Sequence, residues 1–472
     1  MTTITLNKNN PYELALIKIS ELIKGSRWEH SVYAVGGCVR DKLMGKEIHD
    51  IDLAIAYPNG GIQFAEWICK ETDCFKENSN PCIFPNYGTA KFNIRSISEI
   101  ENIDIECVQT RKEQYHNTNS RNPNTTYGSI YDDAHRRDLT INSLYLNLTN
   151  MMVFDPTKQG INDINNKIIR TPNDPDIVFK DDPLRILRVI RFASRFNWGI
   201  EKKTWLGIVK NAYRLNIVSY ERIKDELCKI MECDKPSLAI KRLDGCGVLK
   251  WLIPEVYNMK GVKQNKYHFG DVYEHTLAVV DNTYPIALHR LAALFHDCGK
   301  VPTQTFHNGE YHFYGHEDMS AIIARRVLTT LKFSNKDVNS ICCAIKEHMR
   351  LKQYGDKCPS DKVLRKLLKA VGDENLLITL DVIDADNNSH SETYNAPNQV
   401  SLVVDRLKHL DTKEKDIVKL PINGKDIMKL FNIKPSPIVG TYLKIVEDAV
   451  MENPNITKEE CINLLKSIKN VE

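Results

Sequence analysis

Two aspartates in the amino-terminal part of the chain, Asp50 and Asp52, are separated by one residue within the run IHDIDLAIAY. Alternate residues of a β-strand project from the same face, so this run predicts a strand that presents both carboxylates to one site. Neighbouring carboxylates repel each other unless a cation lies between them, and hard oxygen ligands suit Mg²⁺. The pair therefore predicts a two-metal displacement site. One ion would activate an attacking hydroxyl, and the other would hold a triphosphate and its leaving group.

A glycine pair precedes these aspartates. Gly36 and Gly37 end the apolar run SVYAVGG, and Arg40 follows them. Glycines permit a tight turn whose amide groups face an anion, and Arg40 adds a fixed positive charge. A solvated, aspartate-rich turn is the alternative for an isolated Asp-x-Asp pair. The glycine turn and the arginine favour a site for a triphosphate.

Histidines are concentrated in one part of the chain. Seven of the 14 lie between His268 and His316, where a uniform spread would place about one or two. His296 and Asp297 are adjacent near the expected end of a helix, so they offer nitrogen and oxygen to one divalent ion. Each histidine alone is better explained as a hydrogen-bonded core residue. The ordered set predicts a second metal site.

Five segments of the amino-terminal half occur in a characteristic order: GGCVRDKLMGKEIHDID (36–52), RRDLTIN (136–142), DPTKQG (155–160), DDPLRILRVIRFASRF (181–196) and ERIKDEL (221–227). In order and spacing they resemble the motifs of the class II tRNA nucleotidyltransferases, the CCA-adding enzymes and their poly(A) polymerase relatives. The match covers at least residues 32–255. The resemblance implies a head domain of the DNA polymerase β type, with Asp50 and Asp52 as catalytic ligands of Mg²⁺.

The same resemblance implies a set of nucleotide contacts: Gly36, Gly37, Arg40, Arg136, Asp138, Asn142, Asp182, Arg185 and Arg188. Guanidinium groups are planar forks suited to phosphate oxygens. We expect Arg136 to contact the nucleotide and Arg137 to be a structural ion-pair partner. Glu106, on another expected strand, either approaches the same site or occupies a surface position.

Asp182 and Arg185 are implied to select the base without a nucleic-acid template. They lie three residues apart on a predicted helix, hence on one face. A carboxylate accepts from an exocyclic amine and a guanidinium donates to ring nitrogen or carbonyl acceptors, so the pair suits cytosine and adenine. The family commonly has Glu where this chain has Asp181, which shortens the reach of that carboxylate.

Arg185, Arg188, Arg191 and Arg195 fall within an arc of roughly 120° on the same predicted helix. This basic stripe is either a solvated helix face or a surface that contacts tRNA phosphates, for which Arg191 and Arg195 are the predicted residues. The segment between Arg111 and Arg136 matches the flexible loop of the family. Enzymes that add only CC lack much of this loop, so we expect addition of the terminal A.

The order His275, His296 with Asp297, His316, His348 and Asp386 resembles the HD phosphohydrolase superfamily, with HDCGK (296–300) and YGHE (314–317) as its recognisable segments. The resemblance implies that His275, His296, Asp297 and Asp386 bind a second divalent metal, expected to be a transition metal. His316 and His348 either complete another metal position or bind substrate phosphate. Such domains are associated with hydrolysis of cyclic or terminal phosphates. The alternative is a vestigial domain without this activity.

The chain has 472 residues, of which 26% are charged and 42% hydrophobic. This composition excludes a disordered or fibrous protein. The chain is longer than a single hydrophobic core can accommodate, so several domains are expected. The net charge of +3 is too small for wholesale coating of nucleic acid. Thirteen cysteines without a CxxC pair predict reduced thiols. No run approaches the roughly 18 apolar residues of a membrane span. We expect a cytoplasmic protein that does not contact membranes.

Short β-rich segments come first, and long amphipathic stretches dominate beyond Asp181. This pattern predicts an α+β polymerase-β-type nucleotidyltransferase head followed by all-α domains, one of them an HD domain. The expected domains are the head (1–160), a helical neck and body for base selection and tRNA binding (161–262), the HD domain (263–390) and a helical tail (391–472).

Together these features predict template-independent addition of CCA to the 3′ end of tRNA from CTP and ATP, with HD phosphohydrolase activity beside it. One alternative is an A-only tRNA nucleotidyltransferase or a poly(A) polymerase, which would share the catalytic residues. Another is an HD phosphohydrolase whose head only binds RNA. A third is a non-catalytic tRNA-binding module. The sequence leaves the oligomeric state open.

Overall fold

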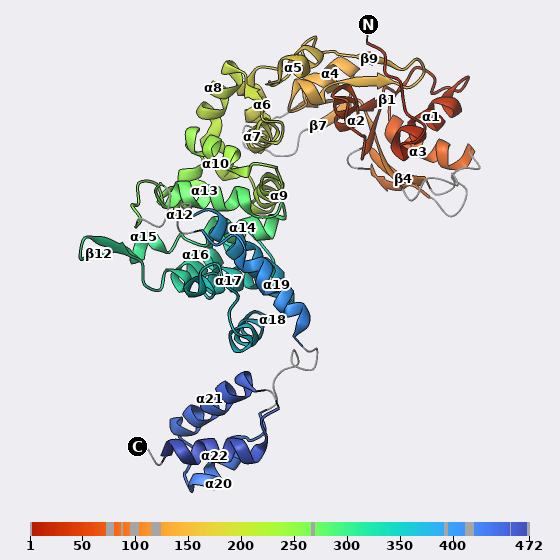
Figure 1. The fold of residues 1–472 in the computed structure, drawn as a ribbon. Coiled ribbons are helices and arrows are strands. Elements are labelled where there is room, and N and C mark those ends of the chain that lie inside the picture. Colours follow the sequence, from red (N-terminus) through yellow and green to blue (C-terminus); the bar gives the residue numbers. More distant parts are fainter. Residues whose placement is uncertain are drawn as a thin grey trace. The chain divides into compact units, whose positions relative to one another are not determined.

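The computed structural model describes residues 2–71, 80–85, 88–94, 103–114, 124–265, 270–390, 395–410, 420–453 and 455–469. The chain forms two compact units, Met1–Val248 and Leu249–Glu472, drawn in Figure 1. Their division, between Val248 and Leu249, differs from the predicted boundary at 262–263, and the predicted domain bounds stay predictions. Part of the expected flexible loop (115–123) and His268 lie outside the described residues. No helix in the described ranges has the length and apolarity to cross a membrane.

A seven-stranded mixed sheet forms the centre of the first unit, in the order β3-β4-β5-β2-β1-β8-β9 (Figure 1). Its strands are β1 (Val32–Val35), β2 (Ile51–Ile55), β3 (Cys82–Phe84), β4 (Thr89–Ile94), β5 (Ile103–Gln109), β8 (Tyr145–Asn147) and β9 (Met152–Phe154). Strand β2 is antiparallel to β1 and parallel to β5. The predicted α+β head is confirmed.

The register of this sheet positions the acidic residues. In β2, Asp52 is exposed between the buried Ile51 and Leu53, as alternation requires. Asp52 pairs in register with Glu106 of β5, and Glu106 pairs with Lys91 of β4. Residues directly opposite each other share a face of a sheet. The three side chains therefore lie in a row across one face.

Helices and short elements complete the first unit. They are α1 (Pro11–Ile23), α2 (Gly37–Leu43), α3 (Gly60–Glu71), β6 (Arg111–Gln114), β7 (Asn124–Tyr127), α4 (Ile130–His135), η3 (Thr140–Asn142), α5 (Gly160–Asn166), β10 (Ile168–Ile169), α6 (Pro175–Asp181), α7 (Arg185–Arg195), β11 (Gly199–Ile200), α8 (Lys202–Asn211), η4 (Ala212–Ile217), α9 (Tyr220–Met231) and α10 (Pro236–Gly245). Helix α3 packs on β2, β4 and β5. Gly36, with φ +80°, makes the turn from β1 into α2, a conformation that glycine adopts without steric cost.

The second unit is mainly helical. Its elements are α11 (Leu249–Leu252), α12 (Pro254–Tyr257), α13 (Val272–Asn282), α14 (Ala287–Phe295), α15 (Lys300–Thr303), β12 (Thr305–His307), β13 (Glu310–His312), α16 (His316–Thr330), α17 (Asn335–Glu347), η5 (Lys352–Tyr354), α18 (Asp361–Asn388), α19 (Gln399–His409), α20 (Gly424–Phe431), α21 (Pro437–Glu452) and α22 (Lys458–Lys469). Helices α13, α14, α16, α17 and α18 pack against one another in pairs. The prediction of helical domains after the head is confirmed, with one β-hairpin, β12–β13, inserted between α15 and α16.

The contact of α3 with the sheet depends on Gly61. A Cβ added there would lie 2.6 Å from the carbonyl oxygen of Gly88 and 2.8 Å from that of Cys107, and neither backbone atom can move freely. We predict that Gly61→Ala lowers the free energy of unfolding by about 1–3 kcal/mol, measured by chemical denaturation. Gly199→Ala, in the same unit, meets no atom within 4 Å and serves as the control. Equal stability of the two variants would contradict this prediction.

Candidate active site

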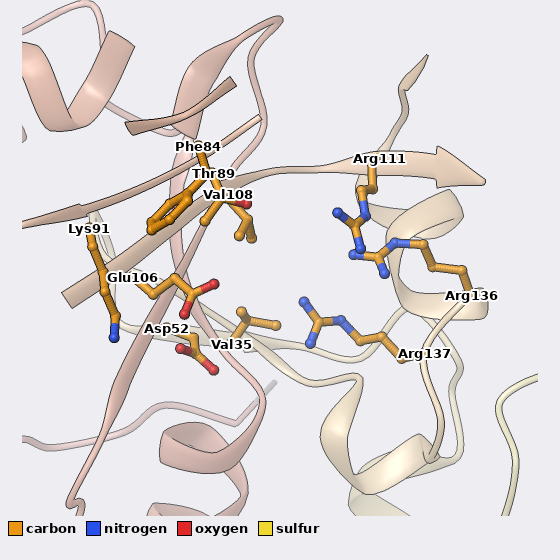
Figure 2. Close-up of a pocket in the computed structure, with 10 residues that line it drawn as sticks. All are labelled: Val35, Asp52, Phe84, Thr89, Lys91, Glu106, Val108, Arg111, Arg136 and Arg137. Atoms are coloured by element: carbon orange, nitrogen blue, oxygen red, sulfur yellow. The ribbon is translucent and has the colours of Figure 1, made fainter. Parts of the chain in front are cut away.

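An open cleft in the head brings carboxylates and arginines face to face (Figure 2). Its volume of about 530 Å³ lies within the range of small-molecule sites. Asp52 and Glu106 lie on one side, and three arginines lie on the other. The residues that line the cleft are Val35, Asp52, Phe84, Thr89, Lys91, Glu106, Val108, Arg111, Arg136 and Arg137.

On the acidic side of the cleft, the carboxylates are close enough to repel one another. The pKa of Asp52 is raised to about 6. The largest cause is partial burial of its carboxyl group, and repulsion from Asp50 and Glu106 adds to it. Asp50 lies beside the first turn of α2, because a Cβ added to Gly37 would be 3.3 Å from Asp50 Oδ2. Glu106 is thus a third acidic residue beside Asp50 and Asp52. Of its two predicted positions, the structure shows the one near the site.

These carboxylates have the oxygen chemistry that Mg²⁺ prefers. Among the described residues, the groups of three candidate ligand atoms within 4.8 Å of one another all lie in the second unit. The head carboxylates do not form such a close group of three. They still repel one another, and a divalent cation bound between them would relieve this repulsion. The residues fit a magnesium site, and their assignment as ligands stays a prediction.

The arginine side is held by two acids, the buried Asp133 and the partly buried Glu113. Asp133 accepts from Arg136 at 2.6 Å and from Arg137 at 3.0 Å, and Glu113 pairs with Arg111 at 3.0 Å and Arg136 at 3.1 Å. Burial acts to raise the pKa of Asp133, but Arg137 and Arg136 hold it well below its ordinary range. Neither acid was predicted from the sequence, although Glu113 is two residues from Arg111 and Asp133 is three residues from Arg136.

Arg137 forms the ion pair expected of it, with Asp133, and the expected contact of Arg136 with nucleotide stays a prediction. Both guanidinium groups line the cleft, and both pair with Asp133. The positive charge of Arg137 lowers the pKa of Asp52, whereas Arg136 is also paired with Glu113. Arg137 therefore interacts more directly with the acidic side, and either arginine is placed to meet an anion in the cleft.

Behind the cleft, a buried polar chain joins the glycine turn to helix α7. Arg40 pairs with Asp41 at 2.8 Å and donates to Asn142 Oδ1 at 2.6 Å. Asn142 donates to Asp138 at 3.2 Å, and Asp138 accepts from Arg188 at 2.6 Å. Arg40, Asn142 and Asp138 are buried. The structure gives these predicted nucleotide contacts a supporting position, and their contact with nucleotide stays a prediction.

The expected single helix through Asp182 and Arg185 is wrong. Helix α6 ends at Asp181, Asp182 is extended with φ −144° and ψ 102°, and α7 begins at Arg185. Asp182 instead caps the new turn, because its Oδ1 accepts from the backbone of Leu184 at 3.1 Å. Its other oxygen pairs with Arg222 at 2.7 Å. The pair is near in sequence but does not share a helix face.

The expected exposed basic stripe is wrong at two of its four positions. Arg185 and Arg191 are buried, with 9% and 8% exposure. Arg191 pairs with Glu226 of α9 at 2.7 Å, and that carboxylate also lies 3.6 Å from Arg188. A buried, paired guanidinium is poorly placed to contact RNA phosphate, so we do not retain Arg191 as an RNA contact. Arg195 is exposed, and its role stays a prediction.

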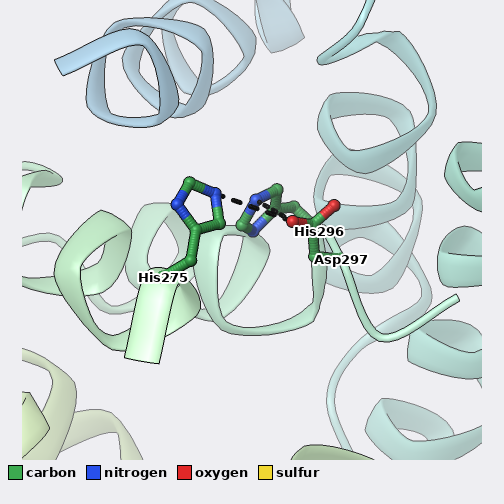
Figure 3. A group of neighbouring side chains, drawn as sticks. All are labelled: His275, His296 and Asp297. Carbon is green, nitrogen blue, oxygen red and sulfur yellow. Dashed lines mark ion pairs between the residues drawn. The ribbon is translucent and has the colours of Figure 1, made fainter. Parts of the chain in front are cut away.

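A second cluster lies within the helical unit. His275 of α13 lies near His296 and Asp297, which follow α14, as Figure 3 shows. Asp297 Oδ2 is 3.6 Å from His275 Nε2 and 3.2 Å from His296 Nε2, and Asp386 Oδ1 is 3.0 Å from His275 Nε2. The structure thus brings together the four residues predicted as metal ligands.

The other oxygen of Asp297 faces a second histidine pair. Asp297 Oδ1 is 3.3 Å from His316 Nε2 and 4.0 Å from His348 Nε2. Asp297, His316 and His348 form one group of close candidate ligands, and His275, His296 and Asp297 form another. Asp297 therefore belongs to both groups, which matches a dinuclear arrangement.

Hydrogen bonding prepares these imidazoles to bind metal. The Nδ1 atoms of His296, His316 and His348 lie 2.7, 2.8 and 2.6 Å from backbone carbonyl oxygens. Donation from Nδ1 leaves Nε2 as the lone-pair atom that a metal takes. Within the described residues, His296 Nε2 and His316 Nε2 are buried without a hydrogen-bond partner. The donor set therefore fits divalent transition metals.

The raised pKa of Asp52 gives a test of the acidic cluster without added metal. Its ionisation is disfavoured in the folded state, so the cost to stability is absent below about pH 4 and complete above about pH 6. We predict that Asp52→Asn raises the melting temperature in EDTA at pH 8 and changes it little at pH 4, measured by calorimetry. Glu21→Gln removes an exposed carboxylate of α1 as the control. Equal shifts at both pH values would contradict the repulsion.

Three family models match the chain: the Poly A polymerase head domain over residues 32–170, the RNA and SrmB-binding site of polymerase A over 197–259, and tRNA nucleotidyltransferase domain 2 over 316–465. Among curated proteins, the Schizosaccharomyces pombe tRNA nucleotidyltransferase cca1 is 36% identical over 47% of this chain and 45% of its own length. The mitochondrial CCA tRNA nucleotidyltransferase of Saccharomyces cerevisiae is 26% identical over 92% of this chain and 87% of its own length.

A solved structure supports the same fold. The CCA-adding enzyme of Bacillus stearothermophilus in complex with CTP aligns with a TM-score of 0.66 and 21% identity, over 98% of both chains. The alignment with the fission yeast relative spans less than half of that protein. The ordered motifs, the three matching models in sequence and the mixed-sheet head agree with one another. Over these segments the chain is similar to the class II tRNA nucleotidyltransferases and their poly(A) polymerase relatives.

Proposed function

We propose that this protein adds CCA to the 3′ end of tRNA, using CTP and ATP and no nucleic-acid template. The observation that carries the proposal is the cleft of the head, where Asp52 and Glu106 face Arg111, Arg136 and Arg137. A nucleoside triphosphate combines phosphate oxygens for the arginines with sites for metal ions held by carboxylates. The cleft offers both kinds of partner within one space.

In this proposal Asp50 and Asp52 bind Mg²⁺, with Glu106 beside them. When bound, the ions supply activation of the tRNA 3′ hydroxyl and stabilisation of charge on the triphosphate. The chain contributes orientation: Arg136 and Arg137 hold phosphate oxygens, because Asp133 fixes both guanidinium groups. The glycine turn at Gly36 and Gly37 keeps side chains out of the space beside Asp50.

Base selection is proposed for Asp182 and Arg185 in a form adapted to the observed break between α6 and α7. Asp182 is partly exposed and presents its second carboxylate oxygen to Arg222. Arg185 Nη1 is buried and has no hydrogen-bond partner among the described residues. Its Nη2 lies 3.9 Å from Glu113. An arginine with an unused buried donor is suited to a base acceptor.

Nucleotide incorporation tests this function. The substrate is tRNA that ends at the discriminator base, supplied with CTP alone and then with CTP and ATP. We predict two added C residues in the first reaction and CCA in the second. Asp50→Ala with Asp52→Ala should abolish addition, because both carboxylates are lost. His296→Ala with Asp297→Ala serves as the matched control and should retain addition.

Failure to incorporate C would remove the CCA proposal and leave A-only addition or poly(A) synthesis. These alternatives are relevant because relatives differ: a protein of Deinococcus radiodurans is named an A-adding enzyme, and one of Thermus thermophilus a CC-adding enzyme. They are 27% and 26% identical to this chain. The activity of this chain is therefore decided by the assay rather than by similarity.

A second function is proposed for the histidine cluster, namely metal-dependent hydrolysis of phosphoesters. It is supported by the two ligand groups that share Asp297. A transition metal bound there would supply an activated water. The residues that hold it would be His275, His296, Asp297 and Asp386, with His316 and His348 on the other oxygen of Asp297.

Metal content tests this second function. We predict that the full chain, dialysed against Mn²⁺, retains metal by inductively coupled plasma mass spectrometry, and that His296→Ala with Asp297→Ala loses at least half of it. His409→Ala, at an exposed position of α19, should leave the content unchanged. Metal retention that is the same in all three proteins would contradict the proposed centre.

The cytoplasmic location expected from the sequence stays a prediction. The names of two yeast relatives place those proteins in mitochondria. Fractionation of cells that express the full chain, with detection of the protein in each compartment, would decide between these locations.

A further inference from the structure

A small cavity of about 200 Å³ opens onto the histidine cluster. Asp297, His316, His348 and Asp386 form one part of its wall. The other part comes from a different kind of residue: two lysines and the aromatic segment 311–314, which continues from β13 to the start of α16. The proposed phosphoester hydrolysis uses only the first part. The lysines and residues 311–314 are not used in that proposed reaction.

The two lysines bring positive charge to the cavity. Lys300 is buried and lies 2.7 Å from Asp297 Oδ2 while it donates to Gln264 at 2.8 Å. Lys352 lies 2.7 Å from Asp386 Oδ2. Each ammonium therefore stands beside a carboxylate of the cluster and carries three donors. Cations at this position favour an anionic ligand such as phosphate.

The aromatic residues lie at the mouth of the cavity. His312 and Tyr314 are stacked, with ring centroids 5.5 Å apart and an interplanar angle of 4°. Tyr314 is 79% exposed, and it lines the cavity together with His312, so a face of its ring is open to a ligand. Gly315, with φ +71°, joins Tyr314 to the candidate ligand His316. The ring is thus fixed two residues from the cluster.

We propose that Tyr314 and His312 form a stacking platform for a nucleobase, and that Lys300 and Lys352 contact the phosphate of the same nucleotide. The ligand of the cluster would then be a nucleoside phosphate, either free or at the end of an RNA chain. Aromatic faces bind bases by stacking with little dependence on sequence. This inference rests on the proposed hydrolytic function of the cluster, and it adds the recognition of the base.

The dimensions of the site favour one nucleotide over a helix. The cavity has room for a phosphate and part of a ribose, and its exposed ring leaves the base outside the cluster. The interior bases of a duplex are stacked on both faces, so they cannot offer a free face to Tyr314. A single nucleotide or a single-stranded end meets both requirements. The aromatic hairpin and the lysines therefore recognise different parts of one ligand.

The test measures binding rather than turnover. Calorimetry in EDTA titrates the full chain with adenosine 3′-phosphate and, separately, with inorganic phosphate. We expect Tyr314→Ala to weaken binding of the nucleotide about tenfold, consistent with loss of one base stack, and to leave phosphate affinity within twofold. Tyr314→Phe keeps the ring and should behave as the unaltered chain. Lys352→Gln should weaken both ligands alike.

The control variants separate this inference from the proposed function. Any nucleotide bound by the head is the same in all variants, because Tyr314 belongs to the second unit. Equal nucleotide affinity in the unaltered chain and Tyr314→Ala would overturn the platform, even if the metal assay succeeds. A tenfold loss would support it, even if His296→Ala with Asp297→Ala retains all its metal.

A second ligand identifies the source of the nucleotide. A short single-stranded RNA with a 3′ phosphate is titrated beside adenosine 3′-phosphate. Equal dependence of both ligands on Tyr314 supports recognition of the terminal nucleotide alone. Dependence of the RNA only would overturn the proposed platform for a single nucleotide, because the affinity for adenosine 3′-phosphate would then be the same with and without the Tyr314 ring. Independence of both ligands from Tyr314 overturns the proposal and leaves the aromatic surface to a partner of another class.

Discussion

The pairing of Asp138 with Arg188, at 2.6 Å, is the constraint on which the head and its neighbouring helix depend. Asp138 is buried; burial acts to raise its pKa, but the charge of Arg188 together with the hydrogen bonds from Asn142 and Arg188 lowers that pKa to about 2. Removal of one partner from such a pair leaves an unpaired buried charge, which costs about 3–5 kcal/mol. Through Asn142 the same pair reaches Arg40. The glycine turn and α7 are therefore parts of one electrostatic unit.

The two sides of the head cleft carry opposite charges. The arginines are kept in place by acids that lie outside the cleft lining, Asp133 and Glu113, so part of their positive charge is neutralised before any ligand arrives. On the acidic side, Asp52 keeps a pKa of about 6 because burial and two other carboxylates act on it. That side is prepared for a cation. A ligand that combines phosphates with metal ions satisfies both sides together.

Much of this organisation could be predicted from the chain itself. Alternation in IHDIDLAI placed Asp52 correctly, and the order of the histidines identified a cluster that the fold assembles. The break before α7 was also readable, since Pro183 disfavours helix for the residue before it, but the strong periodicity of LRILRVIRF concealed it. The burial of Arg191 was not readable, because its partner Glu226 lies 35 residues away on α9. Lys352 was missed for the same reason, as it is 34 residues from Asp386.

The hairpin β12–β13 enters the chain between two segments that carry candidate ligands, Asp297 before it and His316 after it. Strand β12 is exposed and β13 is partly buried, and the cavity at the cluster is lined by Tyr311 and His312 of β13. Evolution can therefore change the length and side chains of this insertion without disturbing the helices that hold the imidazoles. Closely similar proteins could differ in what they accept at this centre while their coordination chemistry stays the same.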